Sequence, residues 1–240
     1  MYTVAIVQAR MGSSRLPGKT MADILGKPIL WHLINRLRYS QLLDKIVIAT
    51  TDNTKDETIL ELARKSGIDS YAGSEDDVLD RYYQAAKKYN AEVVVRITAD
   101  CPLIDAHVVD KVINRFLEGD YDYATNILIR TYPDGLDVEV MSFSALEKAW
   151  REDRNPAWRE HVTPYIMRHP EKFKIHNITN EKDYSYMRWT VDTIEDLTFV
   201  RKIYDHFQND NFNWQEVLHL LEMHPEWLKI NQHIRQKIIK

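Results

Sequence analysis

Residues 4–28 read VAIVQARMGSSRLPGKTMADILGKP, and the order of elements within this stretch decides the fold class. It opens inside a short apolar run, residues 3–9, whose β-branched side chains are typical of a buried strand. A loop rich in Gly, Ser and Pro follows. Strong apolar periodicity starts only at Pro28, which suits the first position of a helix. A strand, a loop and a helix in this order predict the first unit of an α/β protein.

The same alternation continues through the first half of the chain. The further strands that we expect are residues 45–51, 91–100 and 120–126. The expected helices are residues 28–40, 56–67, 76–90 and 105–119. Strands alternating with helices of this length predict a Rossmann-like α/β fold, in which helices cover both faces of a mostly parallel sheet.

The pattern changes after about residue 127. A turn signal, Pro-Asp-Gly, lies at residues 133–135, and apolar alternation follows it over residues 136–140. The later helices are expected at residues 142–152, 156–168, 194–207 and 213–224, and the later strands at residues 173–179 and 184–193. The second of these strands could return to the main sheet. We expect one domain, residues 1–240, with a small inserted region for substrate binding or dimerisation at about 127–185.

Composition limits the possible partners and the compartment. The 240 residues carry a formal net charge of −4, which argues against broad electrostatic binding to nucleic acid or to an anionic membrane. No apolar run approaches the length of a membrane span. The single cysteine excludes a disulfide within the chain and fits a reducing compartment, so we expect a cytoplasmic protein.

Residues 12–20, GSSRLPGKT, almost match the P-loop pattern of Gly, four residues and Gly-Lys-Ser/Thr, but here five residues separate the two glycines. A P-loop also needs its Lys at the start of a helix, whose free amides and dipole bind phosphate. Gly26 and Pro28 interrupt any helix that would begin at Lys19. The sequence therefore argues against a P-loop NTPase.

An open loop after the first strand, carrying Arg10, Arg15 and Lys19, is the alternative interpretation. In open α/β sheets, ligands bind outside the carboxyl ends of the strands. Dispersed cations and free backbone amides at that place suit a triphosphate. From these residues alone, a merely solvated basic loop is the other possible interpretation.

A family resemblance gives this loop a context. Residues 7–30, VQARMGSSRLPGKTMADILGKPIL, resemble the first motif of the cytidylyltransferase family, whose members make CMP-activated acid sugars such as CMP-Kdo and CMP-sialic acid. Three later windows are similar to family segments in the same order: residues 73–85, 96–105 and 188–197. In the second window, Ala99 stands where the family usually has Gly. Residues 131–140 and 159–166 are similar to patterns of the spore-coat polysaccharide biosynthesis protein F branch.

The resemblance implies both a fold and a reaction. The fold would be a nucleotidyltransferase sheet of the GT-A-like type. The reaction would be Mg²⁺-dependent transfer of CMP from CTP to an acidic sugar or related acid, with release of pyrophosphate, and the enzyme would be a homodimer. The choice of CTP rests on the resemblance, because a backbone carbonyl can distinguish cytosine from uracil without any side-chain signature.

The resemblance also implies the catalytic and metal-binding residues. Lys19, Arg15 and Asp100 would be catalytic, and Asp100 and Asp192 would bind Mg²⁺. Asp100 ends an apolar strand, where a carboxylate would point into the ligand crevice. Taken alone, Asp100 also fits a helix cap or turn residue, and Asp192 fits the N-cap of the helix that follows it.

The nucleotide and acceptor residues are expected in windows on both sides of this pair. The nucleotide-binding residues would be Ala9, Arg10, Gly12, Ser13, Ser14, Arg15, Lys19, Ser74, Asp77, Arg81, Thr98 and Ala99. The acceptor-binding residues would be Arg130, Asp137, Glu139, His161 and Arg188. An acidic acceptor favours Arg or His. Ser74 also fits a helix cap, His161 a polar residue on a helix face, and Cys101 a buried thiol.

A nucleotide-sugar-dependent glycosyltransferase of GT-A type is the alternative function. That enzyme class would need a DxD metal motif after a strand. Residues 120–122, Asp-Tyr-Asp, come before their expected strand, and the cations of residues 10–19 would have no purpose. A binding protein without catalysis is a third possibility, which the presence of both aspartates and the loop cations argues against.

Overall fold

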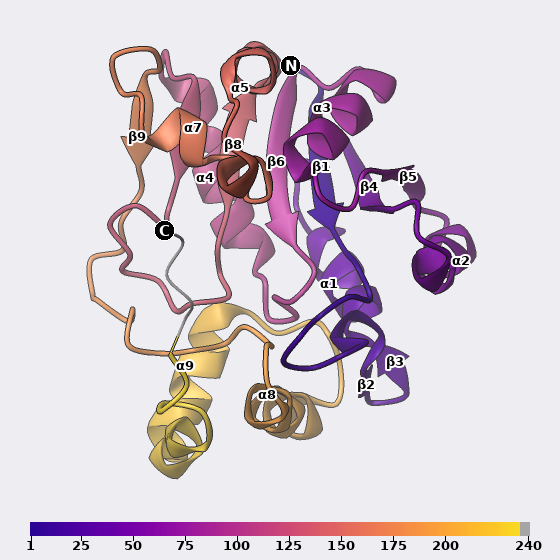
Figure 1. Cartoon of the computed structure of the whole chain (residues 1–240). Coiled ribbons are helices and arrows are strands. Elements are labelled where there is room, and N and C mark those ends of the chain that lie inside the picture. The colour runs from indigo at the N-terminus through magenta and orange to yellow at the C-terminus, as the bar shows by residue number, and fades with distance from the viewer. Residues whose placement is uncertain (236–240) are drawn as a thin grey trace.

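A seven-stranded sheet forms the centre of the computed structural model, which describes residues 1–235 (Figure 1). The strands lie in the order β5-β4-β1-β6-β8-β7-β9. Their bounds are β1 Thr3–Gln8, β4 Lys45–Thr51, β5 Asp69–Gly73, β6 Val93–Thr98, β7 Tyr123–Thr125, β8 Glu139–Ser142 and β9 Ile175–Asn177. Every neighbouring pair is parallel except the two pairs made by β8. The predicted mostly parallel α/β sheet is confirmed.

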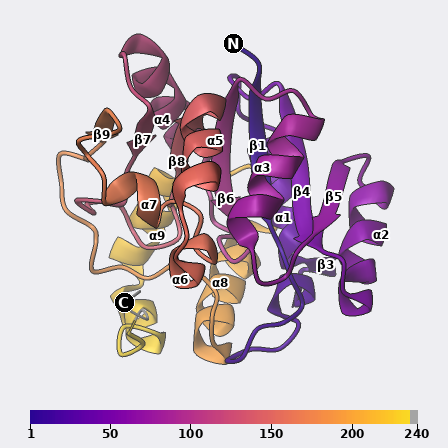
Figure 2. The same ribbon diagram turned by 45° about the horizontal axis from the view of Figure 1, so that its top comes forward.

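Helices cover both faces of this sheet, as Figures 1 and 2 show. One face packs against α1 Ile29–Leu37, α2 Glu57–Lys65, α4 Ala106–Glu118, α8 Ile194–Phe207 and α9 Trp214–Met223. The other packs against α3 Val78–Lys88, α5 Phe143–Glu152 and the short helices α6 Pro156–Arg159 and α7 Pro164–Met167. In β1, Val4 and Ile6 join the second core cluster, while Ala5 and Val7 join the first. Burial on both faces explains why this strand is a continuous apolar run.

The loop after β1 does not contain a P-loop helix. Gly18 has the left-handed backbone conformation, and Lys19–Met21 form a single 3-10 turn. A hairpin of β2 Asp23–Ile24 and β3 Lys27–Pro28 follows, with Leu25 and Gly26 at positive φ in its two-residue turn. The expected break at Gly26 and Pro28 is confirmed, although this hairpin was not predicted.

Two of our predicted elements are wrong, and one strand of the sheet was not predicted. Residues 184–193 form no strand of the sheet, because their amides bond to other segments. Trp189 N donates to Asp134 O, in the 133–135 turn, at 2.6 Å, and Val191 N donates to Asp100 O, just after β6, at 2.8 Å. The expected helix at 156–168 is two short helices, separated at Val162, which has positive φ. Strand β5 was missed because it is an edge strand with no fully buried residue.

The region at about 127–185 contributes directly to the sheet. It supplies β8 and β9, together with helices α5, α6 and α7. Its role in acceptor binding or dimerisation stays a prediction. Within residues 1–235, no helix is both long and apolar enough to cross a membrane.

The turn at Gly135 tests how residues 184–193, which form no strand, pack against the 133–135 turn. A Cβ atom at Gly135, whose φ is +117°, would lie 2.6 Å from Thr190 N and 2.7 Å from Trp189 C. We expect Gly135→Ala to lower the free energy of unfolding by about 3 kcal/mol, since overpacking and backbone strain add. Urea denaturation measures this change.

Gly26→Ala is the matched control. Gly26 also has positive φ, but a Cβ atom there would have no atom of residues 1–235 within 4 Å, its chain neighbours aside. Strain alone should then cost about 1 kcal/mol. Equal losses in the two variants would contradict the close approach of Gly135 to the 189–190 backbone.

Candidate active site

The candidate site lies at the carboxyl ends of β1 and β6. Residues 9–22 leave β1 there, Asp100 follows β6, and Asp192 immediately precedes the cap of α8. Figure 1 shows the carboxyl ends of β1 and β6 at the edge of the sheet that faces α8. Carboxyl ends of parallel strands are the usual ligand site of open α/β sheets.

Lys19 joins the two aspartates. Its Nζ donates to Asp100 Oδ2 at 2.8 Å, to Asp192 Oδ1 at 2.7 Å and to Val191 O at 2.9 Å. Arg15 Nη2 lies 2.7 Å from Asp192 Oδ2. The four residues that we predicted as catalytic or metal-binding therefore form one contiguous ion cluster, although 81 and 173 positions separate Lys19 from the two aspartates.

The ion cluster fixes the charge state of its members. Burial alone would lower the pKa of Lys19, yet Asp100 and Asp192 raise it above its usual value. Burial alone would raise the pKa of Asp100, yet the Lys19 charge and hydrogen bond hold it below its usual value. Both groups are thus ionised at neutral pH.

Neither aspartate caps a helix, although Asp100 does lie in the turn that follows β6. Thr193, and not Asp192, is the N-cap of α8, and its capping box partner is Asp196. Asp105, and not Asp100, caps α4 through bonds from the amides of residues 107 and 108. The carboxylates of Asp100 and Asp192 are therefore free of helix capping.

Arg188 and Asp196 hold Asp192 in position through hydrogen bonds to its side chain and its amide. Arg188 donates to Asp192 Oδ2 at 2.9 Å, to Asp196 Oδ1 at 2.9 Å and to Asp134 Oδ2 at 3.1 Å. Asp196 is fully buried, and its Oδ2 accepts from the amides of Asp192 and Thr193 at 3.0 Å each. Arg188 was predicted to bind the acceptor; here its buried guanidinium reaches an acceptor only if these ion pairs separate.

Asp196 was not among our predicted site residues. The motif Thr-x-x-Asp at residues 193–196 was a visible capping-box signal. The second half of its role depends on Arg188 and on Asn231, whose Nδ2 donates to Asp196 Oδ1 at 2.9 Å. No local sequence pattern signals those contacts.

Three of the predicted nucleotide-binding residues, Ser74, Asp77 and Arg81, lie at or just before the start of α3. Asp77 is the N-cap of α3, accepting from Asp80 N at 2.9 Å, while Ser74 Oγ accepts from Asp77 N at 3.0 Å. Asp77 also pairs with Arg159 of α6 at 2.8 Å. Arg81 is fully buried and donates from Nη1 to Ser74 O at 2.7 Å; its Nε and Nη2 have no hydrogen-bond partner within residues 1–235.

The other predicted nucleotide residues line the strand ends. Ala9 N bonds to Ala49 O at 3.1 Å and Ala99 N bonds to Gln8 O at 2.9 Å, which join the ends of β4, β1 and β6. Arg10 lies 3.6 Å from Glu160 at the end of α6. The remaining members are Gly12, Ser13 and Ser14 in the loop and Thr98 at the end of β6.

The predicted acceptor residues divide by exposure. Arg130 and Asp137 are partly exposed and form a two-pronged ion pair, with N–O distances of 2.5 and 2.8 Å. Glu139 is buried, where it pairs with Arg96 and accepts from Tyr123 Oη at 2.5 Å. His161 is only partly exposed, and burial lowers its pKa. Arg130, Asp137 and His161 are thus more accessible than Glu139.

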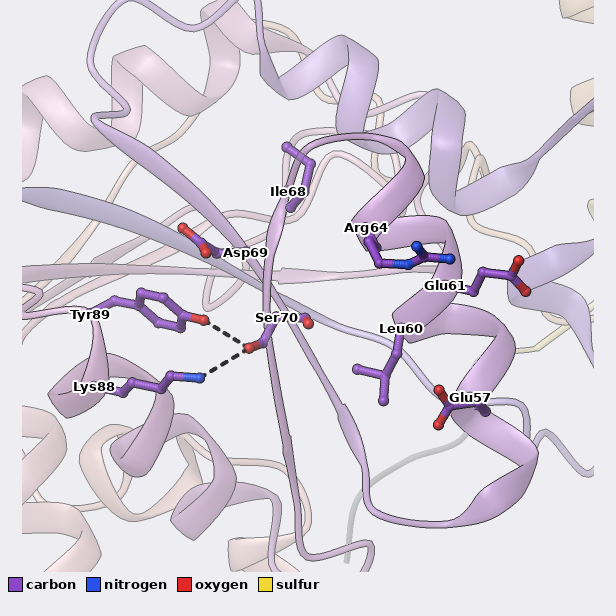
Figure 3. A pocket seen from close by; sticks show the side chains of 9 residues that line it. All are labelled: Glu57, Leu60, Glu61, Arg64, Ile68, Asp69, Ser70, Lys88 and Tyr89. Carbon is purple, nitrogen blue, oxygen red and sulfur yellow. Dashed lines mark hydrogen bonds between the residues drawn. The ribbon is translucent and has the colours of Figure 1, made fainter.

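A separate hollow lies beside β5, the edge strand of the sheet. Strands β4 and β1 separate β5 from β6, the strand that leads to Asp100. It measures about 610 Å³ and is lined by α2, β5 and the end of α3 (Figure 3). Tyr89 Oη and Lys88 Nζ both bond to Ser70 O there, at 2.7 and 3.5 Å. None of the predicted site residues lines this hollow, so volume alone does not identify the site.

Comparison with known proteins finds relatives that match nearly the whole chain. A family model described as cytidylyltransferase matches residues 4–226. A solved cytidylyltransferase from Leptospira borgpetersenii superposes with a TM-score of 0.92 and 35% identity, covering 99% of this chain and 100% of that chain.

Three further relatives cover different shares of the chain. An uncharacterised protein of Methanocaldococcus jannaschii is 38% identical over 99% of this chain and 97% of its own length. The spore coat polysaccharide biosynthesis protein SpsF of Bacillus subtilis is 30% identical over 92% of this chain and 94% of its own. A 3-deoxy-manno-octulosonate cytidylyltransferase of Trichlorobacter lovleyi is 32% identical over 49% of this chain and 46% of its own.

Asp196→Asn tests the support behind Asp192. The substitution keeps the shape but removes the charge that faces the buried Arg188, so we expect the free energy of unfolding to fall by about 3–5 kcal/mol. Denaturant unfolding measures this. Asp205→Asn, on the exposed side of the same helix, is the matched control and should change stability by less than about 0.5 kcal/mol. A similarly small change in Asp196→Asn would contradict the supporting role.

Asp134 predicts a pH dependence of stability. Burial and the neighbouring Asp137 raise the pKa of Asp134 to about 6, although Arg130 and Arg188 lower it. Between about pH 4 and pH 6 the folded state keeps a proton that the unfolded chain has released, so this group makes stability fall as pH rises. We expect Asp134→Asn to remove a fall of about 2–3 kcal/mol over that range, measured by urea unfolding. A profile parallel to that of the wild type would contradict the raised pKa.

Proposed function

We propose a specific reaction for this chain, which belongs to the cytidylyltransferase family and is a CTP-dependent nucleotidyltransferase. It transfers CMP from CTP to an acidic sugar or a related acid, with Mg²⁺ as cofactor and pyrophosphate as the second product. The observation that carries this proposal is the convergence of Lys19 and Arg15 on Asp100 and Asp192.

The two aspartates fit a magnesium site. Mg²⁺ takes hard oxygen ligands and is commonly held by one or two carboxylates, with substrate phosphates and water completing the octahedron. Asp100 and Asp192 would hold it. Within residues 1–235, no group of three or more His, Cys, Asp or Glu side chains is arranged around a metal position, which fits a cation shared with the substrate. When bound, the cation would offset charge on the phosphates.

The chain's own cations would carry the rest of the electrostatic work. Arg10, Arg15 and Lys19 leave the sheet on one loop, so they can face the β- and γ-phosphates together. An acceptor oxygen bonds to the α-phosphorus while the bond from that phosphorus to the bridging oxygen breaks, and pyrophosphate leaves with the electron pair. Fixed cations that face the departing charge lower the barrier without reorganisation.

The acceptor class follows from charge and from relatives. Arg130 is a partly exposed guanidinium, which suits a carboxylate. The relative from Trichlorobacter lovleyi is a cytidylyltransferase of 3-deoxy-manno-octulosonate, an acid sugar, and the Bacillus subtilis relative acts in polysaccharide biosynthesis. These support an acidic sugar that serves as a polysaccharide or glycoconjugate precursor.

The glycosyltransferase alternative finds no support in the geometry. Asp120 and Asp122 precede β7, and β7 runs in the same direction as β1 and β6. The Asp-Tyr-Asp motif therefore lies at the opposite edge of the sheet from Asp100. There the ammonium of Lys174 donates to Asp120, and the backbone amide of Lys174 donates to Asp122.

We further propose a cytoplasmic homodimer. The lone cysteine is buried and free, which fits a reducing compartment. Leu128, Ile129 and Tyr186 are exposed apolar residues at or beside the inserted region, and a C2 pairing is the commonest assembly for such enzymes. Neither a nucleic acid nor a membrane partner belongs to the proposal.

Pyrophosphate release with each of the four NTPs, against a panel of acid sugars and related acids, tests the proposed reaction. We expect release only with CTP, a divalent cation and an acidic acceptor. Asp100→Asn and Asp192→Asn should each lower kcat/KM by at least about 100-fold, since both lose a cluster charge. Asp205→Asn is the control and should keep wild-type turnover. Metal-independent release, or none with any pair, would contradict the proposal.

A further inference from the structure

The ammonium of Lys19 is completely occupied by protein oxygens. An ammonium has three donors, and Asp100 Oδ2, Asp192 Oδ1 and Val191 O take them at 2.7–2.9 Å. The side chain is 13% exposed, so little of its charge faces solvent. Lys19 Nζ thus lies between the two carboxylates, where a cation that both carboxylates bind would have to lie.

The backbone around Lys19 is held by hydrogen bonds that do not involve the Lys19 side chain. Thr20 Oγ1 donates to Arg10 O at 3.0 Å, and Met21 N donates to Gly18 O at 2.9 Å. The four-carbon stem of lysine is flexible, so the Nζ can move while the turn stays in place. Moving it away from the two aspartates and from Val191 O frees its three donors for phosphate oxygens.

The charge balance of the two aspartates differs. Asp192 is also paired with Arg15 and Arg188, at 2.7 and 2.9 Å. For Asp100, Lys19 is the one basic side chain within ion-pair distance among residues 1–235. Removing the ammonium therefore leaves a largely buried carboxylate without a counter-charge, which is unfavourable unless another cation takes its place.

We propose that Lys19 is an internal cation that occupies the divalent-metal position until the nucleotide arrives. This inference rests on the proposed function. The nucleotide's phosphates draw Lys19 away, and the vacated carboxylates then bind the metal. Metal and nucleotide consequently enter together, and a divalent cation alone binds weakly because it must displace the ammonium. An enzyme without this ammonium should therefore bind the metal even when no nucleotide is present.

Binding of Mn²⁺ to the nucleotide-free protein tests the proposal, with the free ion followed by electron paramagnetic resonance. We expect Lys19→Met to bind Mn²⁺ at least about tenfold more tightly than the wild type, because a unit charge a few ångströms away is removed. Lys182→Met removes the same charge from an exposed position and should leave Mn²⁺ affinity at the wild-type value. Adding Asp100→Asn to Lys19→Met should abolish the gain.

Each result has a defined meaning. Equal Mn²⁺ affinity in Lys19→Met and the wild type would overturn the proposal. A gain that survives the added Asp100→Asn would also overturn it, because the metal would then bind elsewhere. Both measurements contain neither CTP nor acceptor, so they stay valid if the pyrophosphate assay fails, and the two failures are distinguishable.

A second measurement uses the wild-type protein and does not depend on how the variant folds. Amine labelling followed by mass spectrometry reports the accessibility of Lys19, with the exposed Lys27 as internal reference. We expect Lys19 to be protected in the free protein, because its Nζ is buried and bonded to three protein oxygens. It should become at least about threefold more reactive when saturating Mn²⁺ displaces it from the carboxylates into solvent. Unchanged protection at a Mn²⁺ concentration that fills the site would show that metal and ammonium do not compete, and would overturn the proposal.

Discussion

The site depends on the hydrogen bonds and the ion pair made by the buried carboxylate of Asp196. This carboxylate accepts from two consecutive amides, from Arg188 and from Asn231, so one side chain shapes the turn that ends in Asp192 and also begins α8. Such a charge is tolerable in the core only because all these donors surround it. The cluster of Lys19, Asp100 and Asp192 needs this turn, because Asp192 has no strand to position it.

Much of the fold could be predicted where local patterns and tertiary packing agree. Strand β4 and helix α8 begin and end at the predicted residues, since a continuous β-branched run and a capping box each mark a boundary within a few positions. Strand β5 escaped prediction because an edge strand with half-buried residues carries little apolar signal. The 184–193 segment has a strand-like pattern, but its amides bond to a turn about 50 positions away, which no local pattern shows.

The candidate site divides in the same way. Lys19, Asp100 and Asp192 could be identified from motifs, because each lies in a window that the family resemblance covers. The meeting of Lys19 and Asp100 follows from the parallel strands β1 and β6 ending at one edge, whereas Asp192 reaches them through the turn that Asp196 holds. Arg188 and Glu139 could be identified as polar residues in these windows, yet their burial in ion pairs depends on partners from other elements. Asp196 looked like an ordinary capping residue, and only three-dimensional contacts reveal its second role.

The reversed direction of β8 has a consequence for how this fold can diversify. In a parallel strand, the residues that follow it reach the ligand edge; in β8, the residues that precede it do so, and these include Asp134 and Asp137. The connection from β7 to β8 therefore crosses the ligand edge on its way, whereas the loops that carry Lys19 and Asp100 belong to other strands. Asp134 in this connection accepts from the amides of Trp189 and Thr190, beside Asp192. Changes in the connection away from the 133–135 turn can therefore remodel the proposed acceptor side with little effect on the proposed nucleotide side.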